Sequence, residues 1–388
     1  MINTEQEWIA QVVEKICTKM EWVSEKSKDK IPYTTIDGIH DDRSVENSEW
    51  RIDEGLSWWC NGFWSGIMWQ MYHETGAEKF AKVARVTEEK LEKSLLQYYG
   101  LHHDVGFMWL LSSVADYRLT NNLEGKRQGM IAANLLAGRF NIKGNYIRAW
   151  NDGIGVDEGK PSNRGWAIID CLMNIPLLYW ASEETNDPRF KHIAIQHADT
   201  VMEHFVRDDG SVRHIVEFDA ETGERKDDFG GQGYEKGSSW TRGQAWGLYG
   251  FVLSYIHTQK EEYLNTAKRI AHYFIANIPE SGLIPVDFRQ PQEPAWEDST
   301  AAAIASSALI TLAEMVGEYE KGLYLKSALQ MLRILDEKRC NWGMDNDCIV
   351  EKCTEAYHTN RHEINIIYGD YFFIEAIFKL KGSKLNLW

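Results

Sequence analysis

Apolar residues recur every three or four positions along nearly the whole chain, which is the spacing of a helix with one buried face. Alternation with a period of two, which is typical of half-buried strands, is scarce. The pattern therefore predicts an all-α protein in which two kinds of helix alternate. The first kind is amphipathic and rich in charge: about 4–24, 78–97, 122–140, 187–206, 261–277 and 320–336. The second kind is apolar nearly all round, as a buried helix is: about 59–75, 104–119, 167–183, 240–258, 299–317 and 369–381.

The lengths of the connections predict how these helices are arranged. Links from a buried helix to the next charged helix are short, as at Gly76-Ala77, Asn121 and Gln259-Lys260. Short links make neighbouring helices antiparallel and gather the long loops at one end. The long connections run in the other direction: 25–58, 141–166, 207–239, 278–298 and 337–368. Six inner helices sheathed by six outer ones, an (α/α)6 barrel, fit this pattern, and no linker divides residues 1–388, so one domain is expected.

The same plan predicts where a functional site lies. Each inner helix begins where a loop from the other layer ends, so six helix N-termini are expected to face one region. Helix N-termini carry unpaired N–H groups and a partial positive charge, which favours anions.

Composition narrows the class of protein. The chain has 388 residues, 44% apolar and 26% charged, with a formal net charge of −16. A strongly acidic chain is a poor partner for nucleic acid or an anionic membrane. The net negative charge of the protein also repels an acidic small molecule. Binding such a molecule therefore requires a local region of positive potential, such as the helix N-termini.

Signals for the compartment point to the cytosol. Residues 1–13 lack the basic and apolar regions of a signal peptide, and no apolar run has the length of a membrane span. Six scattered cysteines form no CxxC pair and are expected to be reduced thiols.

Two acidic residues at the starts of inner helices are the candidates for catalysis. Asp170 follows two isoleucines in an otherwise apolar helix, where an unpaired carboxylate is costly unless it has a function. Burial and a neighbouring carboxylate would raise its pKa toward the value that a general acid needs. Asp104 fits either a helix cap or the second member of the carboxylate pair common in glycoside chemistry.

Other polar residues have less specific patterns. Arg242, in the first turn of an apolar helix, suits a bidentate grip on a carboxylate, or else an ion pair with an acid of another inner helix. His214 and Gln232 lie in one long loop, and the glycines around Gln232 suggest backbone close to a ligand. His102 and His103 are adjacent, and adjacent residues turn onto one ion with difficulty, so neither a metal nor a cofactor is expected.

Several runs in this chain resemble one known family. They are GFWSG (62–66), HHDVGF (102–107), IIDCLMNIPLLYWA (168–181), SSWTRGQAWGLYGF (238–251) and YGDYFF (368–373). In this order they resemble the unsaturated glucuronyl hydrolases of glycoside hydrolase family 88, from about residue 50 to the C-terminus. The resemblance implies an (α/α)6 barrel, in agreement with the helix pattern. The serine-and-lysine pattern that some members use for sulfate is absent from 352–363.

The resemblance also implies an activity and a set of site residues. It makes Asp170 the acid and base and Asp104 its carboxylate partner. The implied partner is an unsaturated acidic oligosaccharide with a C4=C5 double bond, which is hydrated before the next sugar is released. The residues implied around the sugar are Trp59, His103, Trp150, His214, Gln232, Arg242, Trp246 and Tyr357. Sixteen tryptophans suit sugar faces, although core packing is the better expectation for any single one.

Three alternatives remain open from the sequence. Unsaturated rhamnogalacturonyl hydrolases use the same chemistry on pectin fragments. Sugar 2-epimerases use similar barrels with histidine pairs, for which His103 and His214 are the candidates here. A sugar-binding protein would keep the tryptophans but has no need of Asp170 in an apolar helix.

Overall fold

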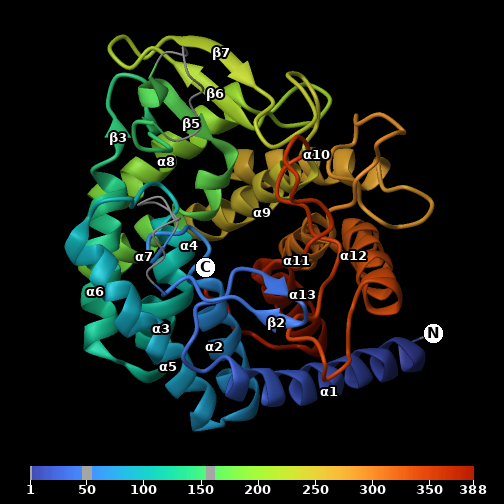
Figure 1. Ribbon diagram of the computed structural model, residues 1–388. Helices are drawn as coiled ribbons and strands as arrows, with labels where there is room; N and C mark the ends of the chain where they lie inside the picture. Colours follow the sequence, from blue (N-terminus) through green and yellow to red (C-terminus); the bar gives the residue numbers. More distant parts are fainter. Residues whose placement is uncertain (1, 46–54, 154–161) are drawn as a thin grey trace.

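Two concentric layers of helices form the protein (Figure 1). The computed structural model describes residues 2–45, 55–153 and 162–388, so parts of the predicted loops 25–58 and 141–166 lie outside the described residues. The outer helices are α1 (Ile2–Lys26), α3 (Glu78–Gln97), α6 (Leu123–Ala137), α8 (Pro188–His204), α10 (Glu261–Ala276) and α12 (Glu318–Lys338). The inner layer contains α2 (Phe63–Thr75), α4 (Val105–Trp109), α5 (Ala115–Thr120), α7 (Pro176–Thr185), α9 (Thr241–Thr258), α11 (Ser299–Met315) and α13 (Ile367–Lys381).

Packing between these helices closes the inner layer into a ring. Along the second half of the chain, α9 packs against α11, α11 against α13, and α13 returns to α2. Outer helices α3, α8, α10 and α12 lie on α2, α7, α9 and α11, whereas α1 lies over α13 and α2. The fold is an α/α barrel, and the predicted fold class is confirmed.

Burial follows the charge pattern of the two layers. Every residue of α11 from Ser299 to Ala313 is buried, and so is every residue of α9 from Thr241 to Ser254. In α10 the buried residues recur at helical spacing and the remaining face is polar. Apolar faces turned inward on both layers make one continuous core, which is what stabilises the ring.

The prediction of an inner helix over 167–183 was wrong for the first half of that segment. Residues Trp166–Ile168 form strand β5, Ile169–Met173 form a 3₁₀ turn (η3), and the α-helix starts only at Pro176. Proline has no N–H to donate and disfavours helical geometry in the residue before it, so it starts a helix rather than continuing one. Asp170 therefore lies in a tight turn between a strand and a helix.

Strand β5 belongs to a small sheet that the scarcity of alternating residues did not predict. It pairs antiparallel with β6 (Ile215–Phe218), which pairs with β7 (Arg225–Phe229). The loops contain two shorter hairpins: β1–β2 (Thr35–Ile36 and Ile39–His40) and β3–β4 (Phe140–Asn141 and Tyr146–Ile147). Such short strands are too brief to leave a period-two pattern in the sequence.

The second inner segment also departs from a regular helix. Between α4 and α5 the backbone widens into a π-helical turn, η1 (Leu110–Val114). π turns inside helices are rare, and those that occur often lie at functional sites. None of the described helices is both long and apolar enough to cross a membrane.

Candidate active site

Asp170 is held at the point where the small sheet meets the barrel. Strand β5 ends two residues before it, and the Ile169 N–H donates to the carbonyl of His214 (3.0 Å). The Asp170 side chain is 15% exposed, and its Oδ2 has no hydrogen-bond partner among the described residues. His214 Nε2 lies 3.7 Å from that oxygen. One buried oxygen of the carboxyl group thus has no hydrogen-bond partner within the described residues.

Asp104 precedes α4 but does not cap it, because its side chain accepts no bond from the N–H groups of the first turn. Its Oδ1 accepts from the Asn174 Nδ2 (2.9 Å), and its Oδ2 lies 3.3 Å from His102 Nδ1 and 3.3 Å from His103 Nε2. The capping alternative for Asp104 is therefore wrong. Its carboxylate instead accepts the Asn174 amide and lies beside two histidine rings.

Asn174 ties the two acidic residues together. Its Nδ2 also contacts the carbonyl of Asp170 (3.2 Å), while its Oδ1 accepts the N–H of Phe107 (2.8 Å). The two segments can approach this closely because residue 106 is glycine: a Cβ there would lie 2.4 Å from the Asn174 Cα. One amide side chain thus links the Asp104 carboxylate to the backbone of Asp170.

The two carboxyl groups have opposite pKa shifts. Burial and the negative charge of Asp104 raise the pKa of Asp170 to about 7. Burial alone would also raise the pKa of Asp104, but His103, His102 and Asn174 outweigh it and lower that pKa below its ordinary value. At neutral pH the pair therefore holds one carboxylate and one carboxyl group poised between its two forms, which is the arrangement an acid/base residue needs.

A raised pKa by itself does not mark the site. Burial also raises the pKa of Asp370 to about 7 and that of Glu88 to about 8. Both are satisfied by the protein: Asp370 accepts the N–H groups of Ile349 and Val350, and Glu88 accepts the indole N–H of Trp69. Asp170 differs because it retains an unpartnered oxygen and some exposure.

His214 and Gln232 form one unit beside Asp170. The Gln232 N–H donates to His214 Nδ1 (3.0 Å), and the His214 ring packs on Trp240 with centroids 4.2 Å apart. Burial lowers the pKa of His214 to about 3, so the ring is neutral near pH 7. The two residues predicted in one loop are thus in direct contact.

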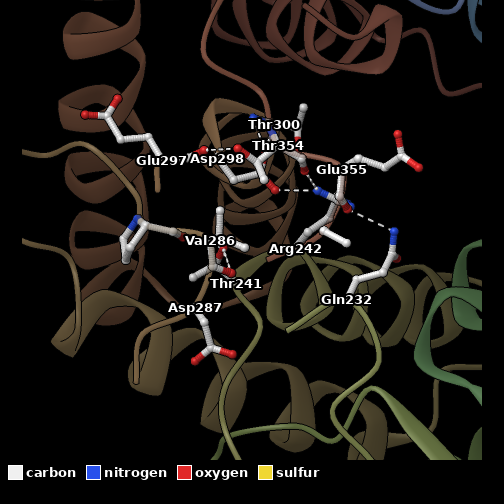
Figure 2. Close-up of polar contacts among 12 residues, drawn as sticks. Gln232, Thr241, Arg242, Val286, Asp287, Glu297, Asp298, Thr300, Thr354 and Glu355 are labelled. Atoms are coloured by element: carbon white, nitrogen blue, oxygen red, sulfur yellow. Dashed lines mark hydrogen bonds and ion pairs between the residues drawn. The ribbon is translucent and has the colours of Figure 1, made fainter. Parts of the chain in front are cut away.

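Arg242 forms the ion pair that the sequence left open as its alternative (Figure 2). Its Nη1 donates to Asp298 Oδ2 (2.5 Å) and to the Thr354 carbonyl, while Nη2 donates to the Glu355 carbonyl (2.5 Å). Burial alone would lower the pKa of Arg242, but Tyr368 and Asp298 raise it. These contacts use three of its N–H donors, and the described residues provide no partner for the others.

Two of the three candidate tryptophans remain partly exposed. Trp59 is half-buried and contacts the rings of Phe63, Phe107 and Tyr368. Trp150 is half-buried beside Trp166. Trp246 has no exposed surface and is covered by Phe107, Tyr368 and Phe372, so it packs in the core and has no face open to a sugar.

The last two candidates, Tyr357 and His103, are each bound to a neighbouring loop through the backbone N–H. The Tyr357 N–H donates to the Gln232 carbonyl (2.9 Å) and its hydroxyl to the Pro294 carbonyl (2.8 Å). His103 is buried, and its N–H donates to the carbonyl of Ala149, next to Trp150. All ten predicted residues are described; Asp104, Asp170, His103 and His214 gather around one centre, and Gln232, Arg242 and Tyr357 meet at the loop around 354–357.

Comparisons with known proteins agree with this geometry. The sequence profile of Glycosyl Hydrolase Family 88 matches residues 23–379. The chain belongs to glycosyl hydrolase family 88. It is 35% identical to the unsaturated glucuronyl hydrolase of Bacillus sp. (strain GL1), over 85% of this chain and 88% of that protein. Its identity to the unsaturated chondroitin disaccharide hydrolase of Streptococcus pyogenes serotype M1 is 31%, over 89% of this chain and 86% of the other.

The solved structures give the same assignment. The crystal structure of the Bacillus sp. GL1 enzyme, described as responsible for the degradation of glycosaminoglycan, superposes with a TM-score of 0.86 and 32% identity. The match covers 96% of this chain and 97% of that one. This family 88 protein is therefore a glycosidase, which disfavours the epimerase and the sugar-binding alternatives.

The expectation that adjacent residues of this glycosidase could not converge on one ion was wrong. The ligating atoms of His102, His103 and Asp104 all lie within 4.8 Å of one another, so adjacent residues do converge here. In the part of the chain that is described, this is the one such group. The same contacts place two histidine rings beside the Asp104 carboxylate and lower its pKa.

Sequence reasoning missed two residues of this family 88 site. Asn174 lies four positions after Asp170 and bridges both acids; its spacing from Asp170 is the signal that was available. Asp298 pairs with Arg242 and caps α11 by accepting the N–H of Thr300. It lay among the polar residues at the inner-helix starts, but its partner could be identified only from the fold.

Proposed function

We propose that this family 88 hydrolase removes the unsaturated uronic acid from the non-reducing end of chondroitin, hyaluronan or heparin type disaccharides left by polysaccharide lyases. The observation that carries the proposal is Asp170, a carboxyl group with a pKa of about 7 and one unpartnered oxygen, held beside Asp104. Two relatives are named unsaturated glucuronyl hydrolase and unsaturated chondroitin disaccharide hydrolase, and these names support the substrate class.

The first step uses Asp170 as an acid. The substrate's C4=C5 bond is part of an enol ether conjugated to a carboxylate. Protonated Asp170 gives its proton to C4, the π electrons form the new C4–H bond, and positive charge develops at C5 next to the ring oxygen. Burial keeps Asp170 protonated up to about pH 7, so the proton is available under ordinary conditions.

The second step uses the same residue as a base. A water molecule attacks C5, and the Asp170 carboxylate takes the proton that the water loses, which restores the starting form of the enzyme. The product is a hemiketal at C5. It opens by breaking the C5–ring oxygen bond, and the resulting hemiacetal at C1 collapses to an aldehyde and expels the partner sugar.

Asp104 has an electrostatic role in this scheme. As a carboxylate it stabilises the developing cation and, by like-charge repulsion, raises the pKa of Asp170. Its own contacts with His102, His103 and Asn174 keep it ionised while Asp170 changes form.

Binding of the substrate carboxylate falls to donors that the protein leaves free. Arg242 keeps N–H donors beyond those used by Asp298, Thr354 and Glu355. His214 Nε2 has no hydrogen-bond partner among the described residues and faces Asp170. A guanidinium and a neutral imidazole N–H suit a carboxylate and a water molecule, respectively.

Aromatic surfaces and the surrounding loop complete the site. Trp59 and Trp150 are only partly buried and are the tryptophans we assign to sugar faces, while Trp246 packs against Phe107. Gln232 and Tyr357 hold the loop that carries the Arg242 acceptors. We further propose that the enzyme works in the cytosol, a reducing compartment, since all six of its cysteines are free thiols.

Matched saturated and unsaturated disaccharides test the mechanism directly. A saturated glucuronide of the same linkage has no π bond to accept the proton, so we expect it to bind and remain uncleaved. Loss of the ultraviolet absorbance of the conjugated double bond follows the unsaturated compound, and chromatography of the released amino sugar follows both. Comparable release from both compounds would return Asp104 and Asp170 to ordinary two-carboxylate glycosidase roles, in which charge develops at C1.

A further inference from the structure

The two ring nitrogens of His214 have different surroundings. The side chain is 2% exposed, and its ring lies against Trp240. Nδ1 faces the backbone of the turn 230–232. Nε2 lies 3.7 Å from Asp170 Oδ2, and neither Nε2 nor Oδ2 has a hydrogen-bond partner in the described part of the chain. The position of the ring proton therefore decides what His214 presents to Asp170.

The turn contains one group that fixes this proton. The Gln232 N–H points at Nδ1 with a nitrogen–nitrogen distance of 3.0 Å. A backbone amide always carries its hydrogen and can only donate, so Nδ1 must accept. The Gly230 carbonyl lies farther from Nδ1, at 3.3 Å, and would favour the opposite tautomer. The shorter contact with a donor that cannot change its role outweighs the longer one with an acceptor.

Only glycine permits the turn to lie this close to the ring. Gly231 has a φ of +59°, and a Cβ on it would be 2.0 Å from His214 Nδ1 and 2.6 Å from Cε1. The ring cannot move away easily because Trp240 covers its face. Any other residue at position 231 must therefore displace the turn, the ring or both.

The turn is anchored on both sides. Gln232 donates through Nε2 to the Glu355 carbonyl (2.9 Å) and accepts the Tyr357 N–H (2.9 Å). After the turn, the buried carboxylate of Asp287 accepts the Tyr234 N–H (3.1 Å) and the Ser239 N–H (2.9 Å). These contacts hold the Gln232 N–H in place against His214.

We propose that the Gly230–Gly231–Gln232 turn is a positioning element that fixes His214 in the tautomer with its proton on Nε2. The ring then presents a neutral N–H donor, and never a base, to an oxygen atom next to Asp170. Burial, which lowers the pKa of His214 to about 3, keeps the second proton off across the working range. The catalytic value of this tautomer rests on the proposed function, but the tautomer is a property of the free protein.

The consequence for the reaction concerns the attacking water. A water that accepts from His214 Nε2 keeps its hydrogens directed away from the imidazole, so one of them can point at the Asp170 carboxylate. The opposite tautomer would offer a lone pair, which competes with Asp170 for that hydrogen. Gly231 is thus a positioning residue for the hydration step, because it acts through the His214 ring.

Nitrogen NMR of the free enzyme tests the tautomer without any substrate. With ¹⁵N-labelled histidine, the spectrum distinguishes a protonated from an unprotonated ring nitrogen, and the signals that His214→Gln removes identify the residue. We expect Nε2 protonated and Nδ1 unprotonated from pH 5 to pH 8. A proton on Nδ1 of His214 would overturn the proposal.

The matched pair Gly231→Ala and Gly237→Ala tests the turn. Gly237 lies in the same loop with a φ of +84°, but a Cβ on it meets nothing within 4 Å, so it reproduces the backbone strain without the contact. We expect Gly231→Ala to populate the Nδ1–H tautomer and to lower kcat on the order of tenfold or more, with a smaller change in KM, because the water is misdirected. Gly237→Ala should keep the wild-type spectrum and kcat.

The outcomes separate this inference from the proposed function. If Gly231→Ala keeps both the His214 signals and the kcat of Gly237→Ala, the turn has no positioning role. If Gly231→Ala fails to fold, the wild-type spectrum alone still decides the tautomer. A fixed Nε2–H tautomer in an enzyme that hydrolyses no unsaturated disaccharide would support the inference and refute the function.

Discussion

At the scale of single residues, Asp104 and Asp170 show one side chain in two protonation states. Asp104 has three polar neighbours and is stabilised as the anion, while Asp170 has an unpartnered oxygen and a negative neighbour. Divergent pKa values within a pair of carboxyl groups identify which is the acid and which is the fixed charge. The chemistry thus depends on the neighbours and not on the residue type.

Asp170→Asn should remove nearly all activity, by about 10² to 10⁴ or more, because one group serves both proton transfers. The same variant should become more stable relative to wild type as the pH rises. Asp170 has a raised folded pKa, so its contribution to folding is fully present below about pH 4 and is lost as the pH rises to about 7. Asparagine avoids that loss, which is on the order of a few kcal/mol.

Thermal unfolding of both proteins at pH 4 and pH 8, with turnover measured on the same preparations, checks this prediction. A folded Asp170→Asn protein with near wild-type turnover would contradict the role of the residue. A stability difference that does not grow with pH would contradict the raised pKa.

Asp104→Asn should move the alkaline limb of the kcat profile to lower pH. Removing the negative neighbour lowers the pKa of Asp170, so the acid form is lost earlier as the pH rises. Asparagine can still accept from Asn174, so the geometry is retained. Turnover measured from pH 5 to pH 9 decides the point, and an unmoved limb would mean that burial alone sets the pKa of Asp170.

At the scale of elements, the site depends on how closely α4 approaches the η3 turn. Gly106 and Asn174 are in contact there, and the carboxylate of Asp104 and the backbone of Asp170 are both bound by the Asn174 amide. The irregular elements of the inner layer, the π turn η1 and the 3₁₀ turn η3, are both next to this contact in the chain. Regular helices in these places would present different side chains to one another.

Gly106→Ala should destabilise the protein by about 1–3 kcal/mol, since a Cβ there overlaps the backbone of Asn174. Gly322→Ala in α12 is the matched control, because a Cβ at that helical glycine meets nothing within 4 Å. Alanine should stabilise that position by about 0.4–1 kcal/mol. Urea unfolding measures the free energy of unfolding of both variants. If Gly106→Ala is as stable as Gly322→Ala, α4 does not approach the η3 turn closely enough to exclude a Cβ.

At the scale of the whole molecule, ring closure joins the beginning of the chain to its end. Inner helix α13 packs on α2, and the buried Trp388 contacts Phe372 and Phe107 beneath the second inner segment. Its indole N–H donates to Glu375 (2.8 Å). No part of such a ring has a complete core by itself.

The barrel should therefore unfold in one transition, as the prediction of a single domain requires. Tryptophans are spread over the chain, so their fluorescence reports tertiary packing in both halves, while far-ultraviolet circular dichroism reports the helices. We expect the two signals to change together with urea. Two separated transitions would mean that the chain divides into independently folding parts.

The sequence by itself determined the layers of this protein. Charge-poor helices such as 299–317 and charge-rich ones such as 261–277 differ in composition, and composition decides which faces leave water. Short links at Asn121 and Gln259-Lys260 decided which end holds the long loops. Asp170 was identifiable because a carboxylate in an apolar segment is costly.

Only the tertiary structure decided the partners, because contacts between residues far apart in the chain leave no local pattern. The pairing of Arg242 with Asp298 spans 56 positions, and that of Asp104 with Asn174 spans 70. The burial of Trp246 beneath Phe107, and the strand and 3₁₀ turn around Asp170, likewise follow from neighbours supplied by other segments. Periodicity records how each segment meets water, but the pKa of Asp170 and the tautomer of His214 depend on which segments meet each other.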